Sequence, residues 1–584
     1  MGVESKLCRL GFDQETGHFS VWDRGSDRKA IDCGMFGVWW RENGEDRHTF
    51  ISQLEQVEIE ETKETLRVIG RHSAGWNITW EAKLVAGITG IEVKMSFENK
   101  SLKPIELVDM ILLEGEYIRP EGIADKWWVF ENGWQSWSPS VNRTGIRSSR
   151  LPRFFYLRDI NLGSLRYRNT WLKRGILSEM VGSLTALGGK ESLVLGALTT
   201  NQGFVEVFTD KHKFRVTCQA EITVNSGENW ESDWVVAMLE SRAVALVKYA
   251  SLVSQKMKLG KTKEVMTGWC SWYWYGPMIN ERILLDELEG MKKFNRTIPL
   301  KVFLIDGGWC KWGEWLKPDP KKFPHRLEGV FGKVRDAGFV SGLWLAPFMV
   351  QKDSEIYKNH KDWLIKDRND KPVEVRKLTT SSLLNEIDAW AMYGLDPTHP
   401  QACEYLRQVI RTVVKDLGVK YLKLDFLYGA CMGEKYSKNV SRLQALRLGL
   451  KLIRETAGED VYILGCGCPI EAGVGIVDAM RIGLDTGSPL TRTIPLIGSL
   501  INDFCYRRAR QNAEARSFMH AKWWNNDPDC ILVAKGQRLH ATEKEAMTSM
   551  VRRIGGQIFL SDSLKEVTDE DIEKYIRPMF ERVK

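Results

Sequence analysis

Residues 419–426 read Val-Lys-Tyr-Leu-Lys-Leu-Asp-Phe, a mainly apolar run that ends on the carboxylate of Asp425. A run of this length suits a buried strand. A helical pattern follows, with a leucine stripe from Leu443 to Leu450 and with Gly458 where a helix C-cap is expected. A buried strand followed by an amphipathic helix is the repeating unit of parallel α/β folds, so this stretch predicts that class for its part of the chain.

The same unit recurs from about residue 265 onward. Helix-length amphipathic segments separate eight apolar runs, at Val265–Tyr273, Lys301–Asp306, Val340–Ala346, Val419–Phe426, Val461–Cys466, Ala479–Gly483, Ser517–Trp524 and Gln557–Ser561. Eight such repeats favour a (β/α)8 TIM barrel, with an open doubly wound sheet as the alternative. We therefore expect residues 261–584 to form a catalytic barrel.

The first part of the chain alternates with period two instead. Apolar residues occupy every second position from Trp76 to Leu84 and, after a Gly-containing turn, from Ile91 to Phe97. This alternation is typical of half-buried antiparallel strands. We expect residues 1–260 to form an N-terminal antiparallel β-sandwich, and hence a multidomain protein.

Composition excludes several classes of function. The chain has 584 residues and a net charge of +7, spread over 83 basic and 76 acidic residues without a long basic block. We therefore expect neither a nucleic-acid nor a membrane partner. The start of the chain lacks the apolar region of a secretory signal, and no uncharged apolar run reaches the roughly 18 residues of a membrane span. Eleven scattered cysteines suit reduced thiols in the cytoplasm. Nothing in the sequence specifies an oligomeric state.

Cofactor and metal motifs are also missing from the sequence. Residues 465–470 fail the dinucleotide-binding fingerprint because a proline intrudes and the sixth position is Ile470. No Walker loop and no nucleophile-elbow serine occurs. Cys466 and Cys468 lack a second Cys or His pair at zinc spacing. We expect neither a cofactor nor a metal.

A barrel enzyme carries its chemistry at the carboxyl ends of its strands. Three carboxylates (Asp306, Asp425 and Asp485), two cations (Lys423 and Arg481) and several indoles fall there. Taken singly, each aspartate could be a helix N-cap. Together, paired carboxylates beside aromatic rings suit acetal cleavage, in which one attacks the anomeric carbon and the other protonates the leaving oxygen. Lys423 shares a strand face with Asp425 and could keep it ionised, whereas spacing alone gives no partner for Arg481.

Several short motifs resemble glycoside hydrolase family 36, the α-galactosidase or melibiase family of clan D. They are GWCSWY (268–273), KLDF (423–426), LGCG (464–467), MRIG (480–483) with Asp485 following, and NDPDC (526–530). The sequence WQSW (134–137) is similar to the loop by which that family's N-terminal β-domain reaches the active site. The resemblance covers about residues 130–535.

The resemblance implies a retaining exo-α-glycosidase acting on terminal α-D-galactosides of oligosaccharides or other small α-glycosides. Asp425 would be the nucleophile and Asp485 the general acid/base. The residues expected to contact or wall the sugar are Asp306, Lys423, Cys466, Arg481, Trp137, Trp272, Trp344 and Tyr273.

Two departures from the family pattern keep the substrate and the reaction open. The family's second strand usually ends in two aspartates, but here Gly307 follows Asp306. Glu314 or a water could replace the missing carboxylate, or the sugar could differ, as in an N-acetylgalactosaminide or a glucoside. The C-terminal β-domain of the family is expected to be absent or reduced. The sequence is also compatible with a raffinose-synthase-like transglycosidase and with a non-catalytic carbohydrate-binding protein.

Overall fold

The computed structural model describes residues 1–42, 44–118, 126–144, 175–376, 391–487 and 495–581. The chain divides into two compact units. The sandwich unit comprises Met1–Trp134, Ser140–Leu259 and Asn439–Gln444, and the barrel unit comprises Gln135–Pro139, Gly260–Lys438 and Ala445–Lys584. Residues 135–139 therefore belong to the barrel unit although the sandwich sequence surrounds them. Residues 439–444 likewise belong to the sandwich unit although the barrel sequence surrounds them.

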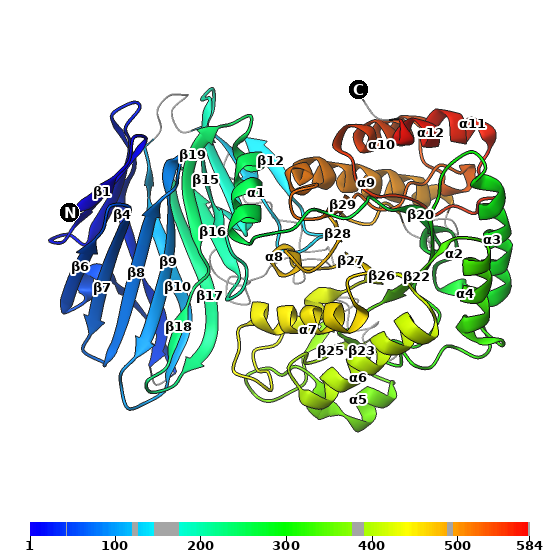
Figure 1. Cartoon of the computed structure of the whole chain (residues 1–584), viewed down its shortest axis with the longest axis horizontal. Coiled ribbons are helices and arrows are strands. Elements are labelled where there is room, and N and C mark those ends of the chain that lie inside the picture. Colours follow the sequence, from blue (N-terminus) through cyan, green and yellow to red (C-terminus); the bar gives the residue numbers. More distant parts are fainter. Residues whose placement is uncertain (43, 119–125, 145–174, 377–390, 488–494, 582–584) are drawn as a thin grey trace. The chain divides into compact units, whose positions relative to one another are not determined.

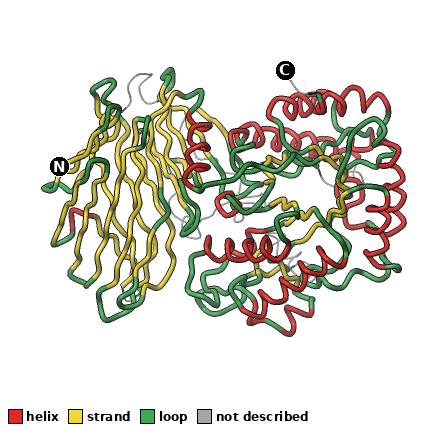
Figure 2. Tube along the Cα trace, in the orientation of Figure 1, coloured by secondary structure: helices red, strands yellow, loops and turns green. Residues whose placement is uncertain are grey.

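The sandwich unit consists of antiparallel strands with few helices (Figure 2). The described strands form two sheets. The first has the order β1 (Gly2–Glu4), β2 (Cys8–Asp13), β3 (His18–Asp23), β4 (Arg28–Glu42), β10 (Ile105–Tyr117), β17 (Lys213–Val224), β16 (Val205–Asp210) and β13 (Ile176–Glu179), with β5 (Glu45–Phe50) paired to β4. The second has the order β12 (Val141–Thr144), β11 (Trp127–Glu131), β14 (Val181–Ala186), β15 (Glu191–Ala197), β19 (Val235–Ser241), β9 (Thr89–Asn99), β8 (Trp76–Leu84), β7 (Thr65–His72) and β6 (Gln56–Glu61), with β18 (Asn229–Glu231) paired to β9. The alternating pattern forms the hairpin of β8 (Trp76–Leu84) and β9 (Thr89–Asn99), which confirms the expected antiparallel sandwich. The apolar face of this hairpin forms part of the core. There Trp80 of β8 stacks on Phe36 of β4 (Arg28–Glu42), with ring centroids 4.7 Å apart.

Among the described residues, the barrel unit contains a sheet of eight parallel strands, which confirms the predicted barrel. Figure 1 labels several of them. The eight strands are β20 (Thr267–Cys270), β21 (Val302–Ile305), β22 (Val340–Leu345), β26 (Tyr421–Leu424), β27 (Tyr462–Gly465), β28 (Ala479–Arg481), β29 (Asn525–Asp527) and β30 (Ile558–Leu560). They neighbour one another in chain order, and β30 pairs with β20. A hydrogen bond from Gln557 N to Asn526 O (2.9 Å) links the β29 and β30 ends of this sheet.

Helices lie outside these strands (Figure 2). They include α3 (Glu281–Phe294), α4 (Arg326–Asp336), α6 (Pro400–Arg411), α7 (Arg442–Ala457), α9 (Pro495–Ala515) and α10 (Ala541–Ile554). The Asn280 side chain caps α3 by accepting the Ile283 N–H, and Gly458 follows α7 with φ 86°, as a C-terminal glycine should. Within the described residues, no helix is long and apolar enough to cross a membrane.

The predicted seventh strand was wrong. Ser517–Trp524 forms a 3-10 turn (Ser517–Met519) and a further turn, whereas the strand is β29, with the sequence Asn-Asn-Asp. The strand is polar because its buried side chains have partners: Asn525 Nδ2 donates to Tyr462 Oη (3.0 Å), and Asp527 accepts from Arg481 (3.1 Å). The apolar run before β29 is buried but does not form an extended strand. Hydrophobic periodicity alone cannot distinguish such a run from a buried strand.

Candidate active site

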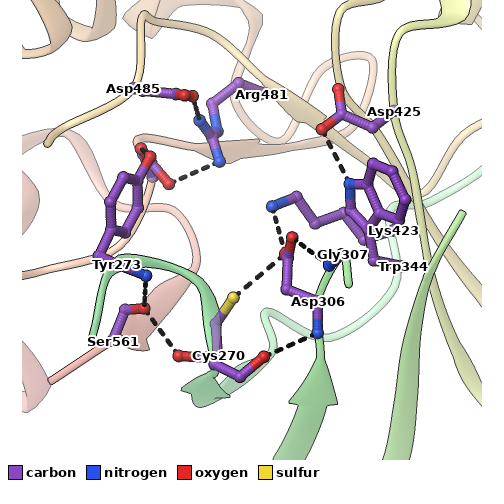
Figure 3. Close-up of polar contacts among 12 residues, drawn as sticks. Cys270, Tyr273, Asp306, Gly307, Trp344, Lys423, Asp425, Arg481, Asp485 and Ser561 are labelled. Carbon is purple, nitrogen blue, oxygen red and sulfur yellow. Dashed lines mark hydrogen bonds and ion pairs between the residues drawn. The ribbon is translucent and has the colours of Figure 1, made fainter. Parts of the chain in front are cut away.

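Asp425 lies at the carboxyl end of β26, with two hydrogen bonds to its carboxylate. The Trp344 indole, from the end of β22, donates to Oδ2 at 3.0 Å (Figure 3). The Phe426 N–H donates to Oδ1 at 2.7 Å. The residue is 7% exposed. A carboxylate has about four lone-pair positions, so these two donors hold it in place and leave lone pairs for a ligand.

The backbone beside Asp425 adopts an unusual conformation. Phe426 has φ 51° and ψ 35°, the left-handed region that bulky residues rarely occupy. This geometry turns the Phe426 N–H back toward Asp425 and places the ring 5.0 Å from those of Trp137 and Trp312. A Cβ on Gly467 would come within 2.9 Å of Phe426 N, so only glycine fits at position 467.

Lys423 and Asp306 form a buried ion pair beneath this rim. Lys423 Nζ lies 2.7 Å from Asp306 Oδ2, and both side chains are less than 10% exposed. Cys270 Sγ approaches the same oxygen at 3.3 Å, and the Gly307 N–H donates to Oδ1 at 2.7 Å. Burial lowers the pKa of Lys423, but Asp306 together with the thiols of Cys270 and Cys466 raises it on balance. Lys423 thus forms its ion pair with Asp306 and not with Asp425, which lies two residues after Lys423 in the sequence.

Arg481 joins three carboxylates at the end of β28. Its guanidinium lies 3.1 Å from Asp485 Oδ1, 3.1 Å from Asp527 Oδ2 and 2.5 Å from Asp529 Oδ1. The Arg481 side chain is 2% exposed, so its charge is neutralised within the protein. Among the described residues, no cluster of His, Cys, Asp and Glu side chains is arranged to hold a metal ion.

Asp485 combines a crowded setting with an open face. Its side chain is 51% exposed, unlike that of Asp527 or Asp529. Desolvation by the surrounding protein raises the pKa of Asp485 to about 6, against the lowering effect of Arg481. A carboxyl group with this pKa can hold a proton near neutral pH and still reach a ligand.

Trp137 lies in the barrel unit, although its loop interrupts the sandwich sequence. Gln135 bridges to Pro469, and Ser136 N donates to Cys468 O at 2.9 Å. The Trp137 ring packs edge-on against Phe426, the residue after Asp425. It is 8% exposed, and its Nε1–H has no hydrogen-bond partner among the described residues. The loop therefore places an indole donor beside the carboxylate rim.

Gly307 lies between two indoles. A Cβ built there would be 3.6 Å from the nearest atoms of both Trp272 and Trp344, which is ordinary van der Waals contact. Glu314 is engaged elsewhere, because its Oε1 accepts the N–H of Glu355 at the start of α5 (Glu355–Asn359). The position next to Asp306 is thus open to a small group.

The two remaining predicted residues are deeply buried. Cys466, after β27, is 1% exposed, and burial together with Asp425 raises the pKa of its thiol. Tyr273, also 1% exposed, donates its hydroxyl hydrogen to a carboxylate oxygen of Asp529.

Sequence reasoning did not identify Asp527 and Asp529 as partners of Arg481. Both belong to the NDPDC motif and follow the predicted seventh strand, but spacing alone did not pair them with Arg481. A buried arginine that needs a counter-charge was the available signal.

Parts of the chain are similar in sequence to known proteins. Residues 284–447 match the melibiase family model. Over 174 residues the chain is 26% identical to the α-galactosidase AgaA of Geobacillus stearothermophilus, covering 28% of this chain and 20% of the relative. It is 31% identical over 156 residues to the α-xylosidase XylQ of Lactiplantibacillus pentosus, covering 25% of this chain and 18% of XylQ. The alignments thus span about a fifth of each relative.

Solved structures extend the likeness in fold to most of the chain. The α-galactosidase TtGalA of Thermus thermophilus, in complex with p-nitrophenyl α-D-galactopyranoside, has a TM-score of 0.65 at 22% identity. The match covers 87% of this chain and 93% of TtGalA. The family 36 α-galactosidase AgaA has a TM-score of 0.58 at 14% identity, covering 94% of this chain and 72% of AgaA. The chain is thus similar to the melibiase family model over residues 284–447, and its fold is similar to that of family 36 α-galactosidases over most of its length.

Proposed function

We propose that this chain is a retaining exo-α-galactosidase that uses Asp425 as nucleophile and Asp485 as general acid/base. The observation that carries the proposal is the contrast between the two carboxylates. Asp425 is buried and held by two donors, whereas Asp485 is half exposed with a pKa raised to about 6. Two carboxylates in different environments support two different roles in glycoside cleavage.

In the first step, Asp425 attacks the anomeric carbon and the bond from that carbon to the glycosidic oxygen breaks. The proton of Asp485 passes to the leaving oxygen, so the aglycone departs as an alcohol. The Trp344 indole, 3.0 Å from Asp425 Oδ2, orients the attacking group. The product of this step is a glycosyl ester on Asp425 and an ionised Asp485.

In the second step, Asp485 takes a proton from a water molecule, whose oxygen attacks the same anomeric carbon. The ester bond to Asp425 breaks and the sugar leaves with its original anomeric configuration. The ion pair with Arg481, 3.1 Å away, stabilises Asp485 while it is charged. Neither step requires a cofactor or a metal ion.

The choice of galactose rests on the relatives, since AgaA and TtGalA are α-galactosidases. The eleven cysteines, none in a disulfide, support a reducing compartment, and we place the enzyme in the cytoplasm.

The test is hydrolysis of a panel of aryl glycosides (α-galactoside, α-N-acetylgalactosaminide, α-glucoside, α-xyloside and β-L-arabinopyranoside), with the anomer of the first product followed by NMR. We expect the galactoside to be cleaved fastest, with α-galactose formed first. Preference for another sugar would overturn the substrate assignment, and a β-product would overturn the retaining mechanism. Transfer to a sugar acceptor instead of water would identify a transglycosidase.

Two variants assign the roles. Asp425→Ala should lose essentially all turnover, and azide should restore some of it with inverted product. Asp485→Ala should impair substrates with poor leaving groups far more than activated aryl glycosides, which need little protonation. Equal losses on both substrate classes would count against Asp485 as the acid.

A further inference from the structure

Asp529 contacts both ends of the segment that carries Asp485. It follows β29, and its side chain is fully buried. Oδ1 pairs with Arg481 Nη2 at 2.5 Å, while Oδ2 accepts the N–H and hydroxyl of Thr486 at 2.8 and 3.1 Å. Arg481 precedes Asp485 by four residues and Thr486 follows it directly. We propose that Asp529 is a positioning residue that fixes the Asp485 side chain by clamping residues 481–486 at both ends. This role rests on the proposed function of Asp485.

The Asp529 carboxylate is itself held firmly. The Tyr273 hydroxyl donates to Oδ2, and Tyr273 is anchored by a 2.8 Å hydrogen bond from its N–H to Ser561 Oγ (Figure 3). The Asp529 backbone has φ 81°, which costs free energy for a non-glycine residue, and its N–H donates to Asp527 Oδ1 at 3.0 Å. Charge-assisted hydrogen bonds of this kind give a rigid support for the segment bearing Asp485.

The clamp also sets the charge around Asp485. The charged groups that act on it are Arg481 of β28, Asp529 after β29, and Asp425 and Lys423 of β26 and its end. The neutral titratable neighbours are Tyr273, Cys466 after β27, and Cys505 of α9. Replacing Asp529 by a neutral residue removes a repelling charge and leaves Arg481 with two carboxylates instead of three. Both changes favour ionised Asp485, so its pKa should fall.

The experiment compares Asp529→Asn with the matched control Asp527→Asn. Asparagine is nearly isosteric, adopts positive φ readily and can still accept from Thr486. Both variants remove a carboxylate from Arg481, but only Asp529 also bonds Thr486. In Asp529→Asn the basic limb of kcat/KM should move to lower pH by about half a unit or more, with a smaller shift in Asp527→Asn. An unmoved limb in Asp529→Asn, or equal shifts in both variants, would overturn the proposal.

A second readout needs no turnover. In protein carrying carboxyl-¹³C aspartate, the resonance that is lost in Asp485→Asn reports the titration of Asp485. Its midpoint should fall in Asp529→Asn. It should rise in Tyr273→Phe, which withdraws a donor from Asp529 and leaves the charge of that carboxylate less neutralised. If no aryl glycoside is cleaved, the proposed function fails while this titration still decides the role of Asp529. If Asp529→Asn does not fold, Tyr273→Phe decides it alone, and an unchanged midpoint there contradicts the clamp.

Discussion

Gly307 leaves space for a carboxylate beside Asp306. A Cβ there would make only ordinary contacts with Trp272 and Trp344, so Gly307→Asp should fold normally. A new acceptor for a sugar hydroxyl contributes about 1.5–3 kcal/mol, or roughly tenfold to a hundredfold. We therefore expect Gly307→Asp to raise kcat/KM for an aryl α-galactoside by that factor, with Gly307→Ala as the control for lost space. Loss of a strong native activity in both variants would mean that the space itself determines the sugar.

The raised pKa that suits Asp485 to acid catalysis should also make its ionised form destabilise the fold. Its pKa rises from 3.8 to about 6 on folding, so the ionised form destabilises the native state. This cost is absent below the unfolded pKa and complete above a pH of about 6. Because the side chain is half exposed, we expect about 1 kcal/mol rather than the full value. Asp485→Asn should raise Tm by about 2 °C at pH 7.5 and leave it unchanged at pH 3.5 in thermal unfolding. A gain at both values would trace the effect to packing instead of charge.

The positions of the charged groups at the strand ends were predictable from the sequence, but their ion-pair partners were not. Asp306, Asp425 and Arg481 were found because strand ends are where a barrel presents side chains. Pairing depends on how neighbouring strands stagger, which a single sequence does not specify. Spacing therefore paired Lys423 with Asp425, two residues away, whereas its ion pair is with Asp306, after β21, which is separated from β26 by one strand.

The loop at residues 135–139 is held by α9. Arg516, just after that helix, donates to Ser136 O at 2.8 Å and to Ile482 O at 3.2 Å, while Asn512 Nδ2 donates to Ser138 O at 3.0 Å. Arg516 thus connects the loop of Trp137 to the segment that follows Arg481. Burial lowers the pKa of Arg516 to about 9.

A double-mutant cycle tests whether Arg516 acts through Trp137. Trp137→Ala should raise KM by removing an indole from the rim, and Arg516→Met should do the same by releasing the loop. If the two act as one unit, the double variant should lose no more kcat/KM than the worse single variant. Additive losses, measured with the same aryl glycoside, would show that Arg516 supports the barrel independently of the loop.

Strand elements were predictable where burial and periodicity agreed. The β8–β9 hairpin followed directly from its alternation, and seven barrel strands coincide with apolar runs. The exception, β29, is polar because its side chains bond other parts of the barrel interior. Tertiary hydrogen bonds replaced the hydrophobic signal there, so local pattern could not locate the strand.

At the scale of the whole molecule, the exchanged segments make the two units interdependent. Removing residues 1–259 removes the loop at 135–139, so the remaining chain should lose kcat/KM for aryl α-glycosides even if its circular dichroism still indicates a folded barrel. Trp137→Ala in the full chain provides the comparison. A truncated barrel that keeps full activity would show that the loop contributes nothing to the site.

The sandwich unit also depends on residues 439–444. Arg442 Nε pairs with Glu221 Oε2 at 2.5 Å, and the arginine side chain is 2% exposed, so the ion pair completes the interior of this unit. During synthesis, the ribosome reaches Gln444 about 185 residues after Leu259. At roughly 5–20 residues per second, this is a wait of about 10–40 s. The amino-terminal half of the nascent chain therefore spends that interval without its last segment, and most of the barrel is translated before the first domain can finish folding.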